Sequence, residues 1–289
     1  MNRPNLSSTL WMRIMQRLGG WYLLVVVVVA QIFSAIGTLI TAFSIQINAE
    51  FTRDEISQIA GLVIGAVIIG NLLLLAGVYF LYPDLRHRLT KWSINEEVDN
   101  NEEQDALVWR QITAFAWSYG AASIAVRIIT NIIPIIIFQI LVLHVTQDQL
   151  IHSFLGAIAA LLGSTVLAIL IVDHLLVPAR EVLLPLTEEA HLTGTINNKV
   201  LTKLLFIVLA LIVASVLMIA PIGYHQTATA LVTGKASVLR TLQVQSLLAT
   251  AFILILGTGM ALLLAQSVSS PLRQLIDTFS KVEAGDLSQ

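Results

Sequence analysis

The sequence contains no cysteine and has few charged residues. The absence of cysteine excludes disulfide frameworks, thiolate metal sites and cysteine nucleophiles. Only 12% of the 289 residues are charged, whereas 56% are hydrophobic and the mean hydropathy is +0.83. Such a composition excludes a water-soluble globular protein, and the net charge of -2 gives no indication of nucleic-acid binding. We therefore expect a polytopic membrane protein that binds lipids.

The hydrophobic residues form blocks with the length of membrane-spanning helices. About 20 helical residues cross the ~30 Å hydrocarbon core of a bilayer. Six blocks meet this requirement, at residues 21–43, 59–82, 112–143, 154–176, 204–224 and 247–268. The sequence predicts an all-α membrane protein whose six spans form three hairpins. Residues 1–20 are then a cytoplasmic N-terminus, 21–268 the membrane domain and 269–289 a separate C-terminal helix.

The distribution of basic residues predicts the orientation of these spans. With both termini in the cytoplasm, twelve lysines and arginines lie inside and three outside, as the positive-inside rule requires. We expect a bacterial-type inner (plasma) membrane protein. The outer connections are then too short to form a binding domain, because a folded core needs several tens of residues. A stimulus must therefore be read in the membrane, at its surface or from inside.

The chain also shows a weak internal repeat. Pro83 and Pro178 follow the second and fourth expected spans and lie 95 residues apart, and Pro271 follows 93 residues later. An arginine comes shortly after each proline, where it could meet lipid phosphates, and proline suits the first turn of a new helix. The pattern fits either common punctuation at a membrane surface or duplication of a helical hairpin.

The last twenty residues have a different character. Ser270 is a suitable N-cap and Pro271 a suitable first helical residue. The apolar residues that follow have the spacing of a coiled-coil seam; they are Leu272, Leu275, Phe279 and Val282. Such a one-sided helix requires a partner helix.

This segment, which continues through Glu283 to Gly285, Asp286 and Leu287, resembles the opening helix of a HAMP domain. The resemblance implies a parallel four-helix bundle in a homodimer, which passes motion of the preceding span to a catalytic module. The sequence ends at Gln289, so we expect a truncated protein or a fragment.

Six spans joined directly to a HAMP helix are similar in layout to the membrane anchors of bacterial class III adenylate cyclases. This second resemblance covers the whole chain but includes no motif in the first 268 residues. We therefore expect no enzymatic activity in this chain and a missing adenylate or guanylate cyclase domain. A kinase or phosphatase effector, a small transporter or channel with a coiled-coil tail, and a purely structural anchor are the alternatives.

A few polar residues within the spans are candidates for sensing. Arg127 is expected near the inner boundary, where it either reaches the head groups or pairs with Asp173. Asn131 and Pro134 follow at helical spacing on one face. These residues predict either a polar pocket for an amphiphilic ligand or a helix–helix contact.

No catalytic, cofactor or metal site is predicted. The sequence lacks a phosphate-binding lysine motif and the paired metal carboxylates that a cyclase needs. His144 and His152 lie at adjoining helix ends and could meet, but no carboxylate cluster accompanies them, so they are expected to be solvated rather than bound to a metal or haem.

Overall fold

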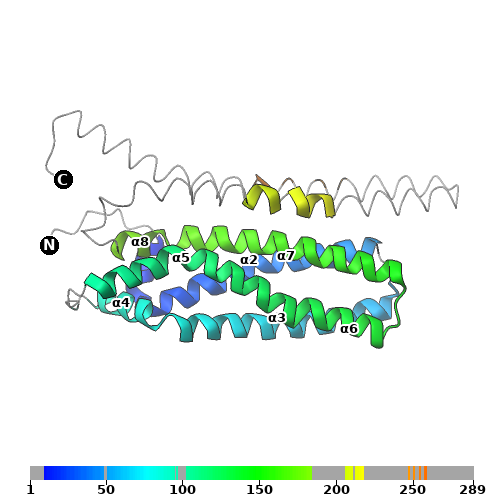
Figure 1. Ribbon diagram of the computed structural model, residues 1–289, viewed down its shortest axis with the longest axis horizontal. Helices are drawn as coiled ribbons and strands as arrows, with labels where there is room; N and C mark the ends of the chain where they lie inside the picture. The colour runs from blue at the N-terminus through cyan, green and yellow to red at the C-terminus, as the bar shows by residue number, and fades with distance from the viewer. Residues whose placement is uncertain are drawn as a thin grey trace, which may run out of the picture.

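The computed structural model describes residues 10–48, 51–94, 96, 102–183, 206–210 and 212–217, together with residues 247, 250, 254, 257 and 258. All regular structure in these ranges is helical (Figure 1). In chain order the elements are α1 (Leu10–Leu18), the 3-10 turn η1 (Gly19–Trp21), α2 (Tyr22–Asn48), α3 (Arg53–Leu81), α4 (Pro83–Ser93), α5 (Glu102–Arg127), the π-helical turn η2 (Ile128–Ile132), α6 (Ile133–Leu141), α7 (Gln147–Leu175) and α8 (Val177–Leu183).

Four helical stretches are long and apolar enough to cross a membrane, as in a multi-pass membrane protein. They run over Leu10–Ala35, Arg53–Leu81, Gln104–Leu141 and Gln147–Leu175. These stretches confirm the first four expected spans. Of the fifth, residues 206–210 and 212–217 are helical, while its other residues and most of the sixth lie outside the described residues. The count of six spans therefore stays a prediction.

The boundaries of the spans differ from the expected ones because polar residues extend the helices beyond the apolar blocks. Both α3 and α7 begin several residues early, at a capping box in which a threonine side chain and the residue three positions later cap each other. Thr52 pairs in this way with Glu55, and Thr146 with Gln149. The N-terminal segment is also structured, since α1 leads through a single 3-10 turn into α2.

The third span is one long helix that contains a π-helical turn. Pro134 is the second residue of α6, directly after this turn. A proline cannot donate the backbone hydrogen bond of a regular helix, and a π-turn, which adds a residue to one turn, is a local way to accommodate that loss. Where the sequence predicted a kink, the structure has a widened turn on the N-terminal side of Pro134.

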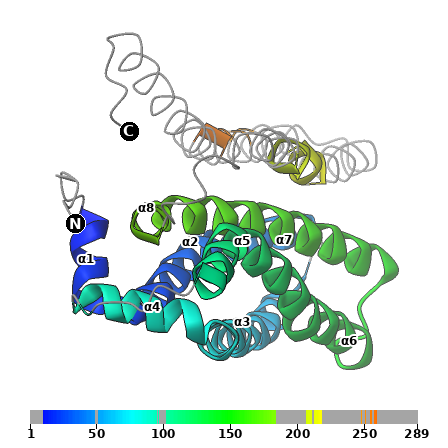
Figure 2. The same cartoon turned by 60° about the vertical axis from the view of Figure 1, so that its left-hand side comes forward.

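The first hairpin consists of α2 and α3, and the second of the α5–α6 helix and α7. Each helix of the first hairpin packs on a different helix of the second. Helix α2 packs mainly on α7, while α3 packs on α5, η2 and α6 (Figures 1 and 2). The buried core lies towards the end where α4 and α8 are found, which we call the α4–α8 end. Its largest fully buried side chains include Tyr22, Phe115 and Ile169. The fifth apolar segment joins this core, because the rings of Trp117 and Phe206 lie 5.3 Å apart.

The two hairpins share a common plan. Helices α3 and α7 both have 29 residues, and their capping threonines, Thr52 and Thr146, are 94 positions apart. Pro83 opens α4 and Pro178 is the second residue of α8, as expected for the first turn of a new helix. This correspondence fits both duplication of a hairpin and common punctuation at a membrane surface.

The arginines after these prolines bind the protein itself. Arg86 donates a 2.8 Å hydrogen bond to the carbonyl oxygen of Tyr79 and stacks on its ring, with the guanidinium carbon 3.8 Å from the ring centroid. Arg180 donates to Asp173, also seven residues earlier, at 2.8 Å. In both hairpins the arginine therefore reaches back to the last turns of the preceding span, a favourable place for a cation at a helix C-terminus.

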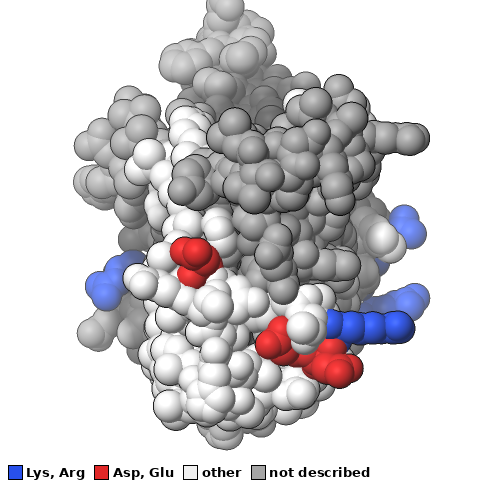
Figure 3. Space-filling view, turned by 90° about the vertical axis from the view of Figure 1, so that its right-hand side faces the viewer, with Lys and Arg blue, Asp and Glu red and all other residues white. Residues whose placement is uncertain are grey.

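Basic residues are distributed unequally between the two ends of the bundle. The described basic residues at the α4–α8 end are Arg13, Arg17, Arg86, Arg88, Lys91, Arg110 and Arg180. At the opposite end, where α3 and α7 begin, the first turns carry Arg53, Asp54, Glu55 and Asp148, and acidic side chains are visible there in Figure 3. An ion pair between Arg88 and Asp105 links α4 to α5 at the α4–α8 end.

Candidate functional site

A cavity of about 370 Å³ lies inside the bundle formed by α2, α3, the α5–α6 helix and α7. Its volume is within the range of small-molecule sites. Most of its wall is aliphatic; the apolar residues are Ala35, Ile56, Ile59, Ala60, Val63, Ile64, Val67, Ile132, Ile135, Ile136, Ala157, Ala160 and Leu161. All four of these helical stretches contribute to the wall, so an occupant would touch both hairpins at once.

Polar side chains gather at one end of this cavity, near the middle of the helices that form its wall. The mid-depth cluster consists of Gln31, Ser34, Asn71, Arg127, Asn131 and Ser164. Hydrogen bonds connect its members across the helices, because the Gln31 amide donates to the backbone oxygen of Asn71 at 3.0 Å and the Ser34 hydroxyl donates to the backbone oxygen of Ser164 at 3.2 Å. Such bonds hold neighbouring spans in register within lipid.

Arg127 is the charged member of the cluster, and its guanidinium donates a hydrogen bond to the Ser164 hydroxyl on α7. Ser164 lies eleven residues before the end of α7 at Leu175, about 16 Å along the helix axis. Arg127 therefore lies nearer the middle of the span than the sequence predicted. At this depth its contact is with the bundle interior, whereas a snorkelling side chain would reach the head groups.

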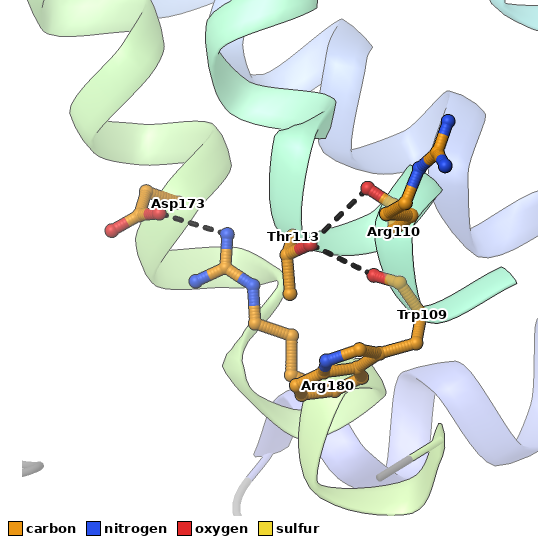
Figure 4. Close-up of polar contacts among 5 residues, drawn as sticks. All are labelled: Trp109, Arg110, Thr113, Asp173 and Arg180. Carbon is orange, nitrogen blue, oxygen red and sulfur yellow. Dashed lines mark hydrogen bonds and ion pairs between the residues drawn. The ribbon is translucent and has the colours of Figure 1, made fainter. Parts of the chain in front are cut away.

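Asp173 has a different partner from the one considered for it. It accepts the hydrogen bond of Arg180, and the side chains of the pair are 14% and 22% exposed, respectively (Figure 4). Asp173 lies nine residues beyond Ser164 on α7, about 13 Å along the axis. The structure thus gives Arg127 a hydroxyl partner and gives Asp173 the arginine of α8.

The other two candidate residues are Asn131, which lies within the π-turn, and Pro134, which lies just after it. Asn131 lines the cavity, and its amide donates to the Thr130 hydroxyl at 3.1 Å. The buried side-chain oxygen of Asn131 has no hydrogen-bond partner within the described part of the chain. Pro134 is not among the cavity-lining residues, because the widened turn between them alters the helical spacing from which a common face was predicted.

Gly70 allows α3 to approach the π-turn beside the cluster. A Cβ atom at this position would lie 2.8 Å from the Thr130 hydroxyl oxygen. That oxygen is held in place, because the hydroxyl donates a 2.8 Å hydrogen bond to the backbone oxygen of Val126. Only glycine therefore fits at this crossing without a displacement of the turn.

Four members of the cluster were not predicted from the sequence, namely Gln31, Ser34, Asn71 and Ser164. A signal was present, since an amide or hydroxyl within an apolar span is unusual and tends to face the bundle interior. The contact between Ser164 and Arg127 was not predictable, however, because the register of two spans is set by packing.

The predicted signal-transducing helix is the remaining candidate site. The HAMP-like segment from Ser270 to Leu287 lies outside the described residues. Among the residues that the structure does describe, no group of three or more histidine, cysteine or acidic side chains could hold a metal ion.

The chain matches no known protein-family model, no curated protein and no solved structure.

Proposed function

We propose that this chain is a signal-input module that binds an amphiphilic ligand within the membrane and passes the signal to a C-terminal effector. The observation that carries the proposal is the 370 Å³ cavity, which combines an aliphatic wall with a polar cluster at mid-depth. This combination suits a ligand that partitions into the bilayer and has one polar group. The proposal also agrees with the expected short outer connections.

The position of the cavity explains how binding could produce a signal. Its wall is formed by both hairpins, so an occupant stabilises the arrangement of hairpins that fits it best. The fifth apolar segment packs on α5 through Phe206 and Trp117, which connects the first four spans to the chain that continues towards the C-terminus. Movement between the hairpins thus has a packed route to the remaining spans.

The output side of the proposal rests on the sequence. Six spans with both termini in the cytoplasm of a bacterial inner membrane would bring the last span directly to the HAMP-like helix. That helix would pair with its copy in a homodimer, and the two-state element would be the packing of the pair. We propose a class III nucleotide cyclase as the effector; a kinase or phosphatase would use the same transmission.

The test is a fusion protein in which residues 1–289 are followed by a complete HAMP domain and a class III cyclase domain. Ala157→Phe places a large ring in the cavity wall, whereas Ala122→Phe places the same ring at an exposed position of α5. We expect the first substitution to change cyclase activity several-fold and the second to leave it unchanged. A second fusion with one residue inserted after Ser269 should uncouple activity from Ala157→Phe.

Equal activity of both phenylalanine variants and of the insertion variant would contradict signal transmission from the cavity. Proteoliposome flux assays on the chain without residues 269–289 test the transporter alternative. Uptake of a solute that Ala157→Phe abolishes would replace the proposal by a transport function.

A further inference from the structure

We infer that the ligand of this cavity is an amphiphile with a single apolar chain and an anionic head group, and that the head group binds at Arg127. The inference rests on the proposed function, since it specifies the chemistry of the ligand that the cavity would bind. It is carried by three observations, which concern the charge of Arg127, its remaining hydrogen-bonding capacity and the shape of the apolar wall.

Within the described residues, no acidic side chain pairs with the charge of Arg127. Arg88 and Arg180 form ion pairs, whereas the partner of Arg127 is the hydroxyl of Ser164. The six expected spans contain a single acidic residue, Asp173, which already binds Arg180, and residues 190–276 contain none. The chain therefore offers no other intramembrane carboxylate to the guanidinium. A cation at this depth is costly without a counter-charge, and an anionic ligand would supply it.

Arg127 also retains donors for a ligand. A guanidinium carries five N–H donors in a planar fork, and the structure records one hydrogen bond, to Ser164. Carboxylate and phosphate groups match this fork with two parallel hydrogen bonds. Asn131 stands one helical turn further on the same cavity wall, and its amide carries a second N–H besides the one that donates to Thr130.

The apolar wall continues from the cluster towards the end where α3 begins. On α3 the lining residues run from Asn71 back to Ile56, about 22 Å along the helix axis. On the α5–α6 helix they run from Arg127 to Ile136. An anionic head at Arg127 would thus leave its chain among isoleucine and valine side chains. A freely soluble small anion would leave this wall uncovered.

The volume of the cavity suits a ligand with one chain. Its 370 Å³ lies near the lower limit of small-molecule sites, which span roughly 300–1,000 Å³. One medium-length alkyl chain with a small head group matches this lower limit better than a two-chain phospholipid. Access from the bilayer is available at α3, where the lining residue Ile64 is 62% exposed.

The experiment measures binding of four probes to the full chain in nanodiscs, by competition with a fluorescent fatty acid. Dodecanoate has the required head and chain, dodecanol has the chain with a neutral head, dodecylammonium has the opposite charge, and acetate has the head without the chain. Empty nanodiscs give the background of membrane partition. We expect dodecanoate to bind at least about tenfold more tightly than dodecanol, because a charge-assisted bidentate contact exceeds a neutral hydrogen bond.

The variants separate the head-group site from the cavity. Arg127→Gln should remove the preference for dodecanoate over dodecanol, and Arg127→Lys should restore part of it. Arg110→Gln, which removes an exposed arginine near the α4–α8 end, should have no effect. Ala157→Phe should weaken binding of both dodecanoate and dodecanol.

The possible outcomes test the charge of the head group, the role of the apolar chain and ligand binding itself. If dodecanol binds as tightly as dodecanoate and Ala157→Phe abolishes both, the cavity binds amphiphiles as proposed but the assignment of an anionic head is wrong. If acetate binds as tightly as dodecanoate and depends on Arg127, the ligand is a small anion and the chain has no role. If no probe binds above the background of empty nanodiscs, both this inference and the proposed binding function fail.

Discussion

Replacing Gly70 by alanine tests the closest helix crossing beside the mid-depth cluster. The new Cβ would lie 2.8 Å from the Thr130 hydroxyl oxygen, shorter than any normal contact between these atoms. The next neighbours, on Asn131 and Val126, would be 3.6 Å away and would not clash. The Thr130 hydroxyl cannot rotate freely, because it is hydrogen-bonded to the backbone oxygen of Val126. The strain is therefore concentrated in one contact between α3 and the π-turn.

The expected cost is that of overpacking, about 1–3 kcal/mol in the free energy of unfolding. Alanine also favours a helix over glycine by up to about 1 kcal/mol, which partly masks the clash. Gly61→Ala is the matched control, since it makes the same change in the same helix and its Cβ would meet no atom within 4 Å. The difference between the two variants isolates the clash at Gly70.

Stability would be measured for both variants by reversible unfolding in a mixed detergent and denaturant. The double variant Gly70→Ala with Thr130→Ala removes the clashing oxygen and should regain most of the lost stability. Equal stability of Gly70→Ala and Gly61→Ala would refute the crossing, as would a double variant that is no more stable than Gly70→Ala. The first result would mean that α3 lies further from the π-turn than the structure shows.

Three further predictions concern the ends of the helices. Thr146→Ala removes the side-chain cap of α7 and should lower the free energy of unfolding by about 0.5–2 kcal/mol. Amide hydrogen exchange should become faster in the first turn of α7 alone, and an equal increase along the whole helix would argue against a local cap. Asp173→Asn and Arg180→Gln should show a coupling energy of about 0.5–3 kcal/mol in a double-mutant cycle, whereas additive effects would exclude the ion pair. Partial burial raises the pKa of Glu181, although its side chain remains exposed, so the folded state slightly favours the protonated form. Stability should therefore fall by a small amount as the pH rises from the ordinary carboxyl range. Glu181→Gln should remove this fall in a series of denaturation midpoints, and an unchanged slope would contradict the prediction.

The sequence predicted the spans well because long apolar runs have few alternative structures. The first four blocks are helices, and the prolines after the second and fourth open new helices. The helix starts were missed, although Thr52 with Glu55 and Thr146 with Gln149 form recognisable capping boxes. Apolar length indicates the part of a helix that lies in lipid, whereas caps determine where the helix begins.

The candidate site was predicted less completely. Arg127 and Asn131 were identified, and the structure places both on the cavity. Their surroundings could not be derived from the sequence, because Ser164 contacts Arg127 only through the relative register of α5 and α7. The π-turn was also missed, since its position depends on how the chain accommodates Pro134 and not on a residue pattern.

The arginine contacts of Arg86 and Arg180 have a mechanical consequence. Each fastens a short surface helix to the span that precedes it, so α4 must follow any tilt of α3, and α8 any tilt of α7. The separation between α4 and α8 then reports the separation of the two hairpins deep in the bilayer. A pair of spin labels on these two helices would therefore measure changes in the width of the cavity. The labels would leave every residue of the cavity wall unaltered.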